Sequence, residues 1–173
     1  MILFFLTFFF IILTLLIWFY YKKKISLINL KDSEKAKIII KNLGNKGIYF
    51  IQKLTEKYPN DKGIQLLKKR FNPDSLEEGN PFEKEMTYTE NKGEKIVMCL
   101  RNSDNLILHD ENLIMYPYIH ELSHLCEENY NKNHSEIFKK YFKLLLKEAV
   151  ECGIYENIDL SRPIKYCNMY ISN

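Results

Sequence analysis

The stretch DENLIMYPYIHELSH, residues 110–124, decides the fold because it combines an apolar helical face with two histidines four residues apart. Its apolar residues recur at helical spacing, and Asp110 is a suitable N-cap. Pro117 removes one backbone donor within the stretch, so the helix is either kinked at Pro117 or begins there with the proline in its first turn. Both alternatives place His120 and His124 on one helix.

The spacing of these histidines is the geometry of a metal site. Residues four apart lie on one helical face, so His120 and His124 can direct two imidazoles at one ion while Glu121 approaches a water on it. Zn²⁺ accepts neutral imidazole nitrogens in a tetrahedral shell, and a catalytic zinc keeps three protein ligands and leaves the fourth position to water. We therefore predict one zinc ion as cofactor and Glu121 as the general base of peptide-bond hydrolysis.

The third ligand must come from outside the pentapeptide HELSH, residues 120–124, and His134 is the best candidate. It opens a second, strongly amphipathic helix that Gly153 would end as C-cap. Residues 127–133 are polar and turn-forming, so the chain can reverse and bring His134 to the metal. Asn133 and Glu136 have the spacing of a capping box, which assigns Glu136 to the helix start. A glutamate third ligand is the alternative.

The pentapeptide alone can occur by chance on a surface helix. Here it lies in phase with an apolar face, a third histidine heads the next helix, and the arrangement uses three of the chain's four histidines. These features together favour a metal site. We expect the fourth histidine, His109, to be a solvated or loop residue. Tyr155 and Tyr166 are candidates for an additional donor to the oxyanion, although most of the twelve tyrosines must be core or surface residues.

Upstream of the motif, the pattern predicts helices and then a hairpin. Residues 32–58 are helical in pattern, with Gly44 and Gly47 as a break, and residues 62–71 form a shorter amphipathic helix. Residues 72–81 have the composition of a polar connecting loop.

Two strand-like runs, 85–90 and 94–101, follow across Asn91-Lys92-Gly93, and residues 106–108 could add a third short strand. We therefore predict an α+β fold with a small antiparallel sheet. An exposed edge of that sheet could bind an extended peptide by backbone pairing, or the hairpin could be a simple supporting sheet.

Length and composition limit the remaining possibilities. A chain of 173 residues allows one ordinary domain beside a targeting segment. Its 25 basic and 22 acidic residues are nearly balanced, and the lysines are scattered, so there is no direct signal for nucleic acid. The cysteines lack paired spacing, and we expect reduced, mostly buried thiols at all four positions, which are Cys99, Cys126, Cys152 and Cys167.

Residues 2–21 carry no charge, and at about 1.5 Å per helical residue they cover the roughly 30 Å hydrocarbon core of a bilayer. The segment ends in four aromatic residues, at 18–21, and Lys22–Lys24 follow, which is typical of a membrane interface. A cleaved signal peptide would instead have a basic start and a small-residue cleavage site. We predict a single-pass anchor at 1–24 and a metallopeptidase domain at 25–173. The positive-inside rule places that domain in the cytosol.

At His120–His124 and at His134-Ser135-Glu136-Ile137-Phe138, the sequence resembles the WLM and SprT-like group of compact zincin metallopeptidases, in which a phenylalanine follows the third zinc histidine by four residues. The match covers about residues 95–155. The strand at 96–101, the helix at 138–153 and the ending at 163–169 are similar to predicted metallopeptidases of large nucleocytoplasmic DNA viruses.

The resemblance implies a minimal zincin in which His120, His124 and His134 bind zinc and Glu121 is the catalytic base. Its substrate would be a protein or peptide, and its membrane a host or virion membrane. A non-catalytic membrane-bound module that retains the zincin fold is the alternative. The intact Glu121 argues against that alternative, because a purely structural zinc site needs no general base and tends to have a fourth protein ligand.

Overall fold

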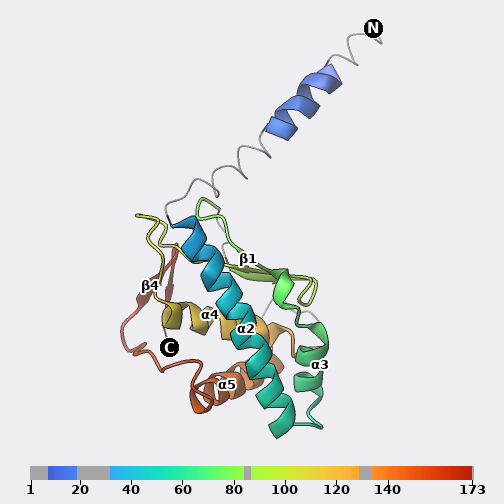
Figure 1. The fold of residues 1–173 in the computed structure, drawn as a ribbon, viewed down its shortest axis with the longest axis vertical. Coiled ribbons are helices and arrows are strands. Elements are labelled where there is room, and N and C mark those ends of the chain that lie inside the picture. Colours follow the sequence, from blue (N-terminus) through green and yellow to red (C-terminus); the bar gives the residue numbers. More distant parts are fainter. Residues whose placement is uncertain (1–7, 19–31, 84–86, 129–133, 173) are drawn as a thin grey trace. The chain divides into compact units, whose positions relative to one another are not determined.

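The computed structural model describes residues 8–18, 32–83, 87–128 and 134–172. The chain divides into two compact units, Met1–Ser33 and Glu34–Asn173. In the first unit, residues 8–18 are helical. The second unit contains helices together with two small sheets, so the predicted α+β class is confirmed (Figure 1). The predicted domain boundary at residue 24 lies outside the described residues.

Within the described ranges, no helix is both long and apolar enough to cross a membrane. The helical residues 8–18 belong to the predicted span at 2–21, and the other residues of that span lie outside the described ranges. The membrane anchor therefore stays a prediction.

Helix α2 (Ser33–Lys57) is continuous, so the predicted break at Gly44 and Gly47 is wrong. Both glycines are buried, and they allow other segments to approach the helix closely. A Cβ atom at Gly47 would lie 2.3 Å from the hydroxyl oxygen of Tyr118 and 2.5 Å from Cζ of Phe71. The absence of a side chain at Gly47 therefore lets α2 pack against the helix that carries the histidine motif.

This packing predicts a larger loss of stability from alanine at Gly47 than at Gly44. Gly47→Ala should lower the free energy of unfolding by about 1–3 kcal/mol, because the new methyl group overlaps the buried Tyr118. Gly44→Ala is the matched control. Its Cβ would lie 3.2 Å from Cβ of Pro73, a milder overlap that opposes the gain of up to about 1 kcal/mol in helix propensity, so the free energy of unfolding should change less than in Gly47→Ala. Urea unfolding of both variants measures the difference; equal stability of the two would contradict the packing argument.

The central sheet has the order β1-β3-β2. Strands β2 (Tyr88–Glu90) and β3 (Lys95–Met98) are antiparallel, so the predicted hairpin is confirmed in its described part. Strand β3 is the middle strand, and Ile96 to Met98 are fully buried in it. Strand β2 forms an edge of this sheet.

The other edge is β1 (Leu76–Glu78), which follows a short 3-10 helix at Pro73–Ser75. It runs parallel to β3, so the sheet is mixed and the predicted antiparallel sheet is wrong in this respect. The predicted loop at 72–81 is therefore wrong for residues 73–78. The third strand predicted at 106–108 is also wrong, because the pairing of this segment is limited to an isolated bridge between Leu108 and Arg101. The buried Arg101 instead donates to Glu78 at 2.6 Å. This ion pair stabilises β1, a strand too short and too polar for its sequence pattern to reveal.

Helix α3 (Lys62–Arg70) agrees with its prediction. Helix α4 (Glu111–His124) begins where predicted, with Asp110 accepting hydrogen bonds from the backbone of the first turn. Pro117 lies inside α4, so the alternative in which the helix begins at Pro117 is wrong. Apolar contacts support α4 around the proline, since Ile114 and Tyr118 are fully buried.

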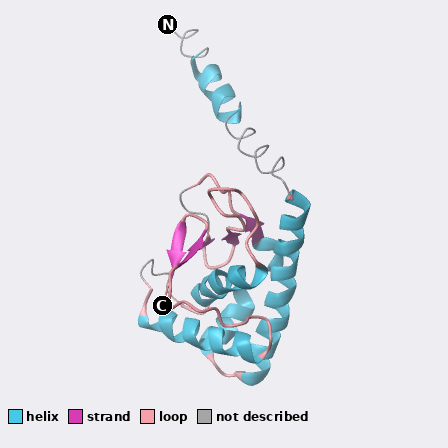
Figure 2. Ribbon diagram, turned by 90° about the vertical axis from the view of Figure 1, so that its left-hand side faces the viewer, coloured by secondary structure: helices cyan, strands magenta, loops and turns pink. Residues whose placement is uncertain are grey.

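Helix α5 (Glu136–Glu151) packs against α4 (Figures 1 and 2). Its N-cap is Ser135, whose hydroxyl accepts a hydrogen bond from the backbone N–H of Phe138 at 3.0 Å. The N-cap is therefore two residues later than the predicted capping box implied, and Asn133 itself lies outside the described residues. Gly153 follows the C-cap residue with φ +74°, a conformation that favours glycine at a helix end.

A C-terminal hairpin of β4 (Ile164–Tyr166) and β5 (Met169–Ile171) completes the second unit. A disulfide between Cys99 and Cys167 joins this hairpin to the end of β3. The expectation of reduced thiols is therefore wrong for these two cysteines, which lie 68 residues apart in the sequence and meet only in the tertiary structure. Cys126 is buried and free, as expected, and Cys152 is free and half-buried.

Candidate metal centre

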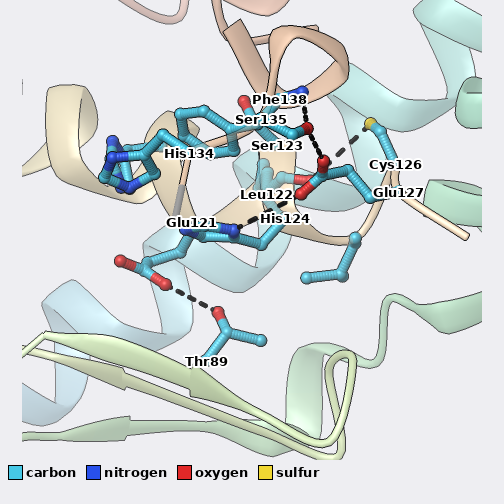
Figure 3. A network of polar contacts seen from close by, with 12 residues as sticks. Thr89, Glu121, Leu122, Ser123, His124, Cys126, Glu127, His134, Ser135 and Phe138 are labelled. Carbon is cyan, nitrogen blue, oxygen red and sulfur yellow. Dashed lines mark hydrogen bonds and ion pairs between the residues drawn. The ribbon is translucent and has the colours of Figure 1, made fainter. Parts of the chain in front are cut away.

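The structure brings together the three histidines that the sequence singled out. His120 and His124 lie on the last two turns of α4. His134 lies just before α5, and Figure 3 shows it together with His124. The Nε2 atoms of His120 and His134 are 3.0 Å apart. One nitrogen from each of the three rings lies within 4.8 Å of the others.

This spacing fits one metal ion. Zn–N bonds of about 2.0–2.1 Å in a tetrahedral shell separate ligand nitrogens by roughly 3.4 Å. The separation between the Nε2 atoms of His120 and His134 is close to that value. The nitrogen of His124 lies within 4.8 Å of both, so a small rotation of its ring would bring it to the same ion. Among the described residues the cluster consists of three imidazoles, which match the donor set of a catalytic zinc.

The environment of the cluster favours the neutral, metal-binding form of two rings. Burial, with smaller contributions from the neighbouring imidazoles, lowers the pKa of His120 to about 3. Burial and His134 lower the pKa of His124 to about 4. A histidine must be unprotonated to bind a metal, so these two rings are ready to do so at neutral pH.

Phe138 forms an apolar wall against the cluster. Its ring centroid lies 4.4 Å from the centroids of His124 and His134 and 4.7 Å from that of His120. Phe142 stacks on Phe138 one turn further along α5. These rings restrict the orientations of the imidazoles, which gives a physical role to the phenylalanine four residues after His134.

Glu121 is buried beside the histidines, with 6 % of its surface exposed. Thr89, in the edge strand β2, donates a hydrogen bond of 2.8 Å to its Oε2 atom (Figure 3). Burial raises the pKa of Glu121 to about 7, and the hydrogen bond from Thr89 opposes this rise. A carboxylate with a pKa near neutrality is well matched to accepting a proton. The sequence did not identify Thr89 as a partner of Glu121, because it indicated only that Thr89 lies in a strand of the hairpin.

The raised pKa predicts a pH-dependent effect on folding of the metal-free chain. The folded state holds the proton of Glu121 more tightly than the unfolded state, so ionisation of Glu121 destabilises the fold as pH rises from 4.5 to about 7. Glu121→Gln should therefore stabilise the chain at pH 8 by on the order of 2–3 kcal/mol, and by much less at pH 5. Urea unfolding in the presence of a chelator measures both values. An equal difference between variant and wild type at the two pH values would contradict this prediction.

His109 is a half-buried loop residue outside the histidine cluster. Its Nε2 accepts a hydrogen bond of 3.1 Å from the backbone N–H of Cys167, and its ring stacks on Tyr166. The expectation of a loop position is confirmed, but the ring holds the C-terminal hairpin rather than being solvated.

Three other side chains that the sequence suggested for the site, as oxyanion donors or as an alternative ligand, have partners elsewhere in the fold. The hydroxyl of Tyr166 donates to the backbone carbonyl of Cys99, and that of Tyr155 accepts from the backbone N–H of Ile158 at 3.5 Å. Glu136 is exposed and pairs with Lys139 at 2.7 Å. The histidine cluster includes His134 and not Glu136.

Fold and site together define an α+β domain with a three-histidine cluster beside a buried glutamate. No model of a known protein family matches the chain, and no solved structure does. The chain is 37% identical over 123 residues to an uncharacterized protein of Acanthamoeba polyphaga mimivirus. The aligned part is 70% of this chain and 59% of that protein, so the chain spans less than two thirds of its relative. The similarity supports a viral protein of the large-DNA-virus type.

Proposed function

We propose that this chain is a zinc-dependent metallopeptidase of the zincin type, in which His120, His124 and His134 hold the ion and Glu121 is the general base. The observation that carries the proposal is the convergence of three imidazoles beside a buried carboxylate. The order of these residues along α4 and before α5 agrees with the resemblance to WLM and SprT-like zincins.

When bound, zinc would supply Lewis-acid polarisation of the scissile carbonyl and acidification of a water. The chain's own contribution is proton transfer. Glu121 would accept a proton from the attacking water and deliver it to the leaving amine, and its burial favours both steps by raising its pKa toward neutrality. Thr89 orients the carboxylate by binding one of its oxygens, Oε2, and we assign the other oxygen to the proton.

The proposed substrate is an extended segment of a protein. Strand β2 is an edge strand of its sheet, and Thr89 in this strand contacts Glu121. A peptide that added to β2 by backbone pairing would therefore lie beside the base. Backbone pairing recognises the main chain, so we expect tolerance of many side-chain sequences.

We further propose that residues 2–21 anchor the chain in a host or virion membrane. The positive-inside rule applied to Lys22–Lys24 predicts a cytosolic domain, whereas a disulfide such as Cys99–Cys167 is more usual in an oxidising compartment. An epitope placed after Asn173 distinguishes the two orientations. If the domain is cytosolic, the antibody should not reach the epitope in intact cells but should reach it once the plasma membrane, and no internal membrane, has been permeabilised.

The test of the proposed activity uses the full chain in detergent. Elemental analysis should find one zinc per chain, and the protein should cleave unfolded casein. A chelator should abolish cleavage, and added zinc should restore it. A chain that binds no zinc, or cleavage that a chelator does not affect, would overturn the proposal. Zinc binding without cleavage would favour the non-catalytic module.

A further inference from the structure

Glu127 is a carboxylate buried next to the candidate metal centre, with 5 % of its surface exposed. It lies three residues after His124, just beyond the end of α4. Burial of a carboxylate is unfavourable unless polar partners compensate for the lost water. The polar contacts of Glu127 therefore show what compensates for the burial of its carboxylate.

The two oxygens of this carboxylate have different partners, one being His124 of the histidine cluster and the other Ser135 (Figure 3). Oε2 lies 3.9 Å from Nδ1 of His124. Oε1 accepts a hydrogen bond from the hydroxyl of Ser135, the N-cap of α5 and the residue that follows His134. One side chain thus lies beside His124 of α4 and is hydrogen-bonded to the residue that follows His134.

The backbone of Glu127 is held in place by a third element. Arg70, at the end of α3, donates from Nη1 to the carbonyl oxygens of Leu125 and Glu127. The chain after α4 therefore has a defined course as far as the carboxylate. This makes Glu127 a fixed point relative to which both histidines can be oriented.

The chemistry of such a contact is known in general terms. A carboxylate beside Nδ1 of a metal-binding histidine fixes the tautomer with a proton on Nδ1, leaves Nε2 for the metal and increases the basicity of the ring. A bound metal would draw electron density from the imidazole and so strengthen the attraction between a proton on Nδ1 and Glu127, whose Oε2 lies 3.9 Å away, just beyond hydrogen-bond distance.

We infer that Glu127 is a positioning residue of the metal centre, which orients His124 directly and His134 through Ser135. The inference rests on the proposed function, because it assumes that the histidines bind a metal. It adds to that proposal a residue outside the ligand set and the base, which the sequence pattern did not single out.

Zinc competition against a chromogenic chelator tests the inference on the full chain in detergent. Glu127→Ala should weaken zinc binding by about 10–100-fold, the usual cost of losing such a contact. Glu127→Gln should weaken it less, because the amide oxygen can still accept the hydrogen bond from Ser135 and present a partial negative charge toward His124. Glu148→Gln is the matched control: Glu148 is also buried, with 6 % exposed, but pairs with Lys57 and Tyr58.

The absorption spectrum of the cobalt-substituted protein provides a readout that a general loss of stability would not change. Its visible bands should shift in Glu127→Ala and keep their positions in Glu148→Gln. Equal zinc affinity and equal spectra in Glu127→Ala and Glu148→Gln would overturn the inference while leaving the proposed function intact. Absence of zinc binding by the wild-type chain would instead overturn the proposed function, and this inference with it.

Discussion

Glu121→Gln should lower the rate of peptide hydrolysis by about 10²–10⁴-fold while the protein keeps its zinc. Glutamine has nearly the same shape and can still accept the hydrogen bond that Thr89 donates to Oε2. It cannot take a proton from water at neutral pH. The variant therefore removes the proposed base without removing a ligand, and the loss should fall on kcat rather than on metal content.

Steady-state cleavage of a quenched fluorescent peptide, together with elemental analysis, separates these two quantities. Glu136→Gln is the matched control, because it makes the same change on an exposed carboxylate near the cluster that pairs only with Lys139 among its described contacts. Wild-type rates in Glu121→Gln would refute the assignment of the base. A comparable loss in Glu136→Gln would show that the effect is not specific to position 121.

His134→Ala should weaken zinc binding by at least about a hundredfold, because loss of a contact outside the ligand set already costs 10–100-fold and this change removes a ligand. The Nε2 atom of His134 lies 3.0 Å from that of His120, so the variant removes one side of the converging cluster. Chelator competition measures the affinity.

Glu136→Ala decides between the two third ligands that the sequence allowed. Glu136 is exposed and outside the cluster, so its removal should change zinc affinity by less than about threefold. The reverse result, a large loss in Glu136→Ala and little in His134→Ala, would assign the glutamate instead.

Local patterns predicted the helices well because their signals lie within one or two turns. Asp110 caps α4 as its residue type suggests, and the hairpin of β2 and β3 follows its turn sequence. The break expected in α2 was wrong because Gly47 serves the approach of Tyr118, a residue of another helix. A glycine within a helical pattern gives the same sequence signal whether it breaks the helix or allows another helix to approach it.

The features that the sequence did not reveal depend on partners far along the chain. Strand β1 exists through parallel pairing with β3 and through the ion pair of Glu78 with Arg101. The disulfide joins Cys99 to Cys167 across 68 residues. No local period or spacing encodes such contacts, because they form only when separate elements pack.

The stretch at 110–124 by itself determined which residues could form a metal site, since the helical period alone puts His120 and His124 on one face. Only the tertiary structure decided how that site is completed. It brings His134 to His120, places Thr89 of an edge strand on Glu121, and buries Glu127 between His124 and Ser135. The physical reason is that helix geometry is set by local hydrogen bonds, whereas the position of a side chain from another element is set by packing of the whole domain.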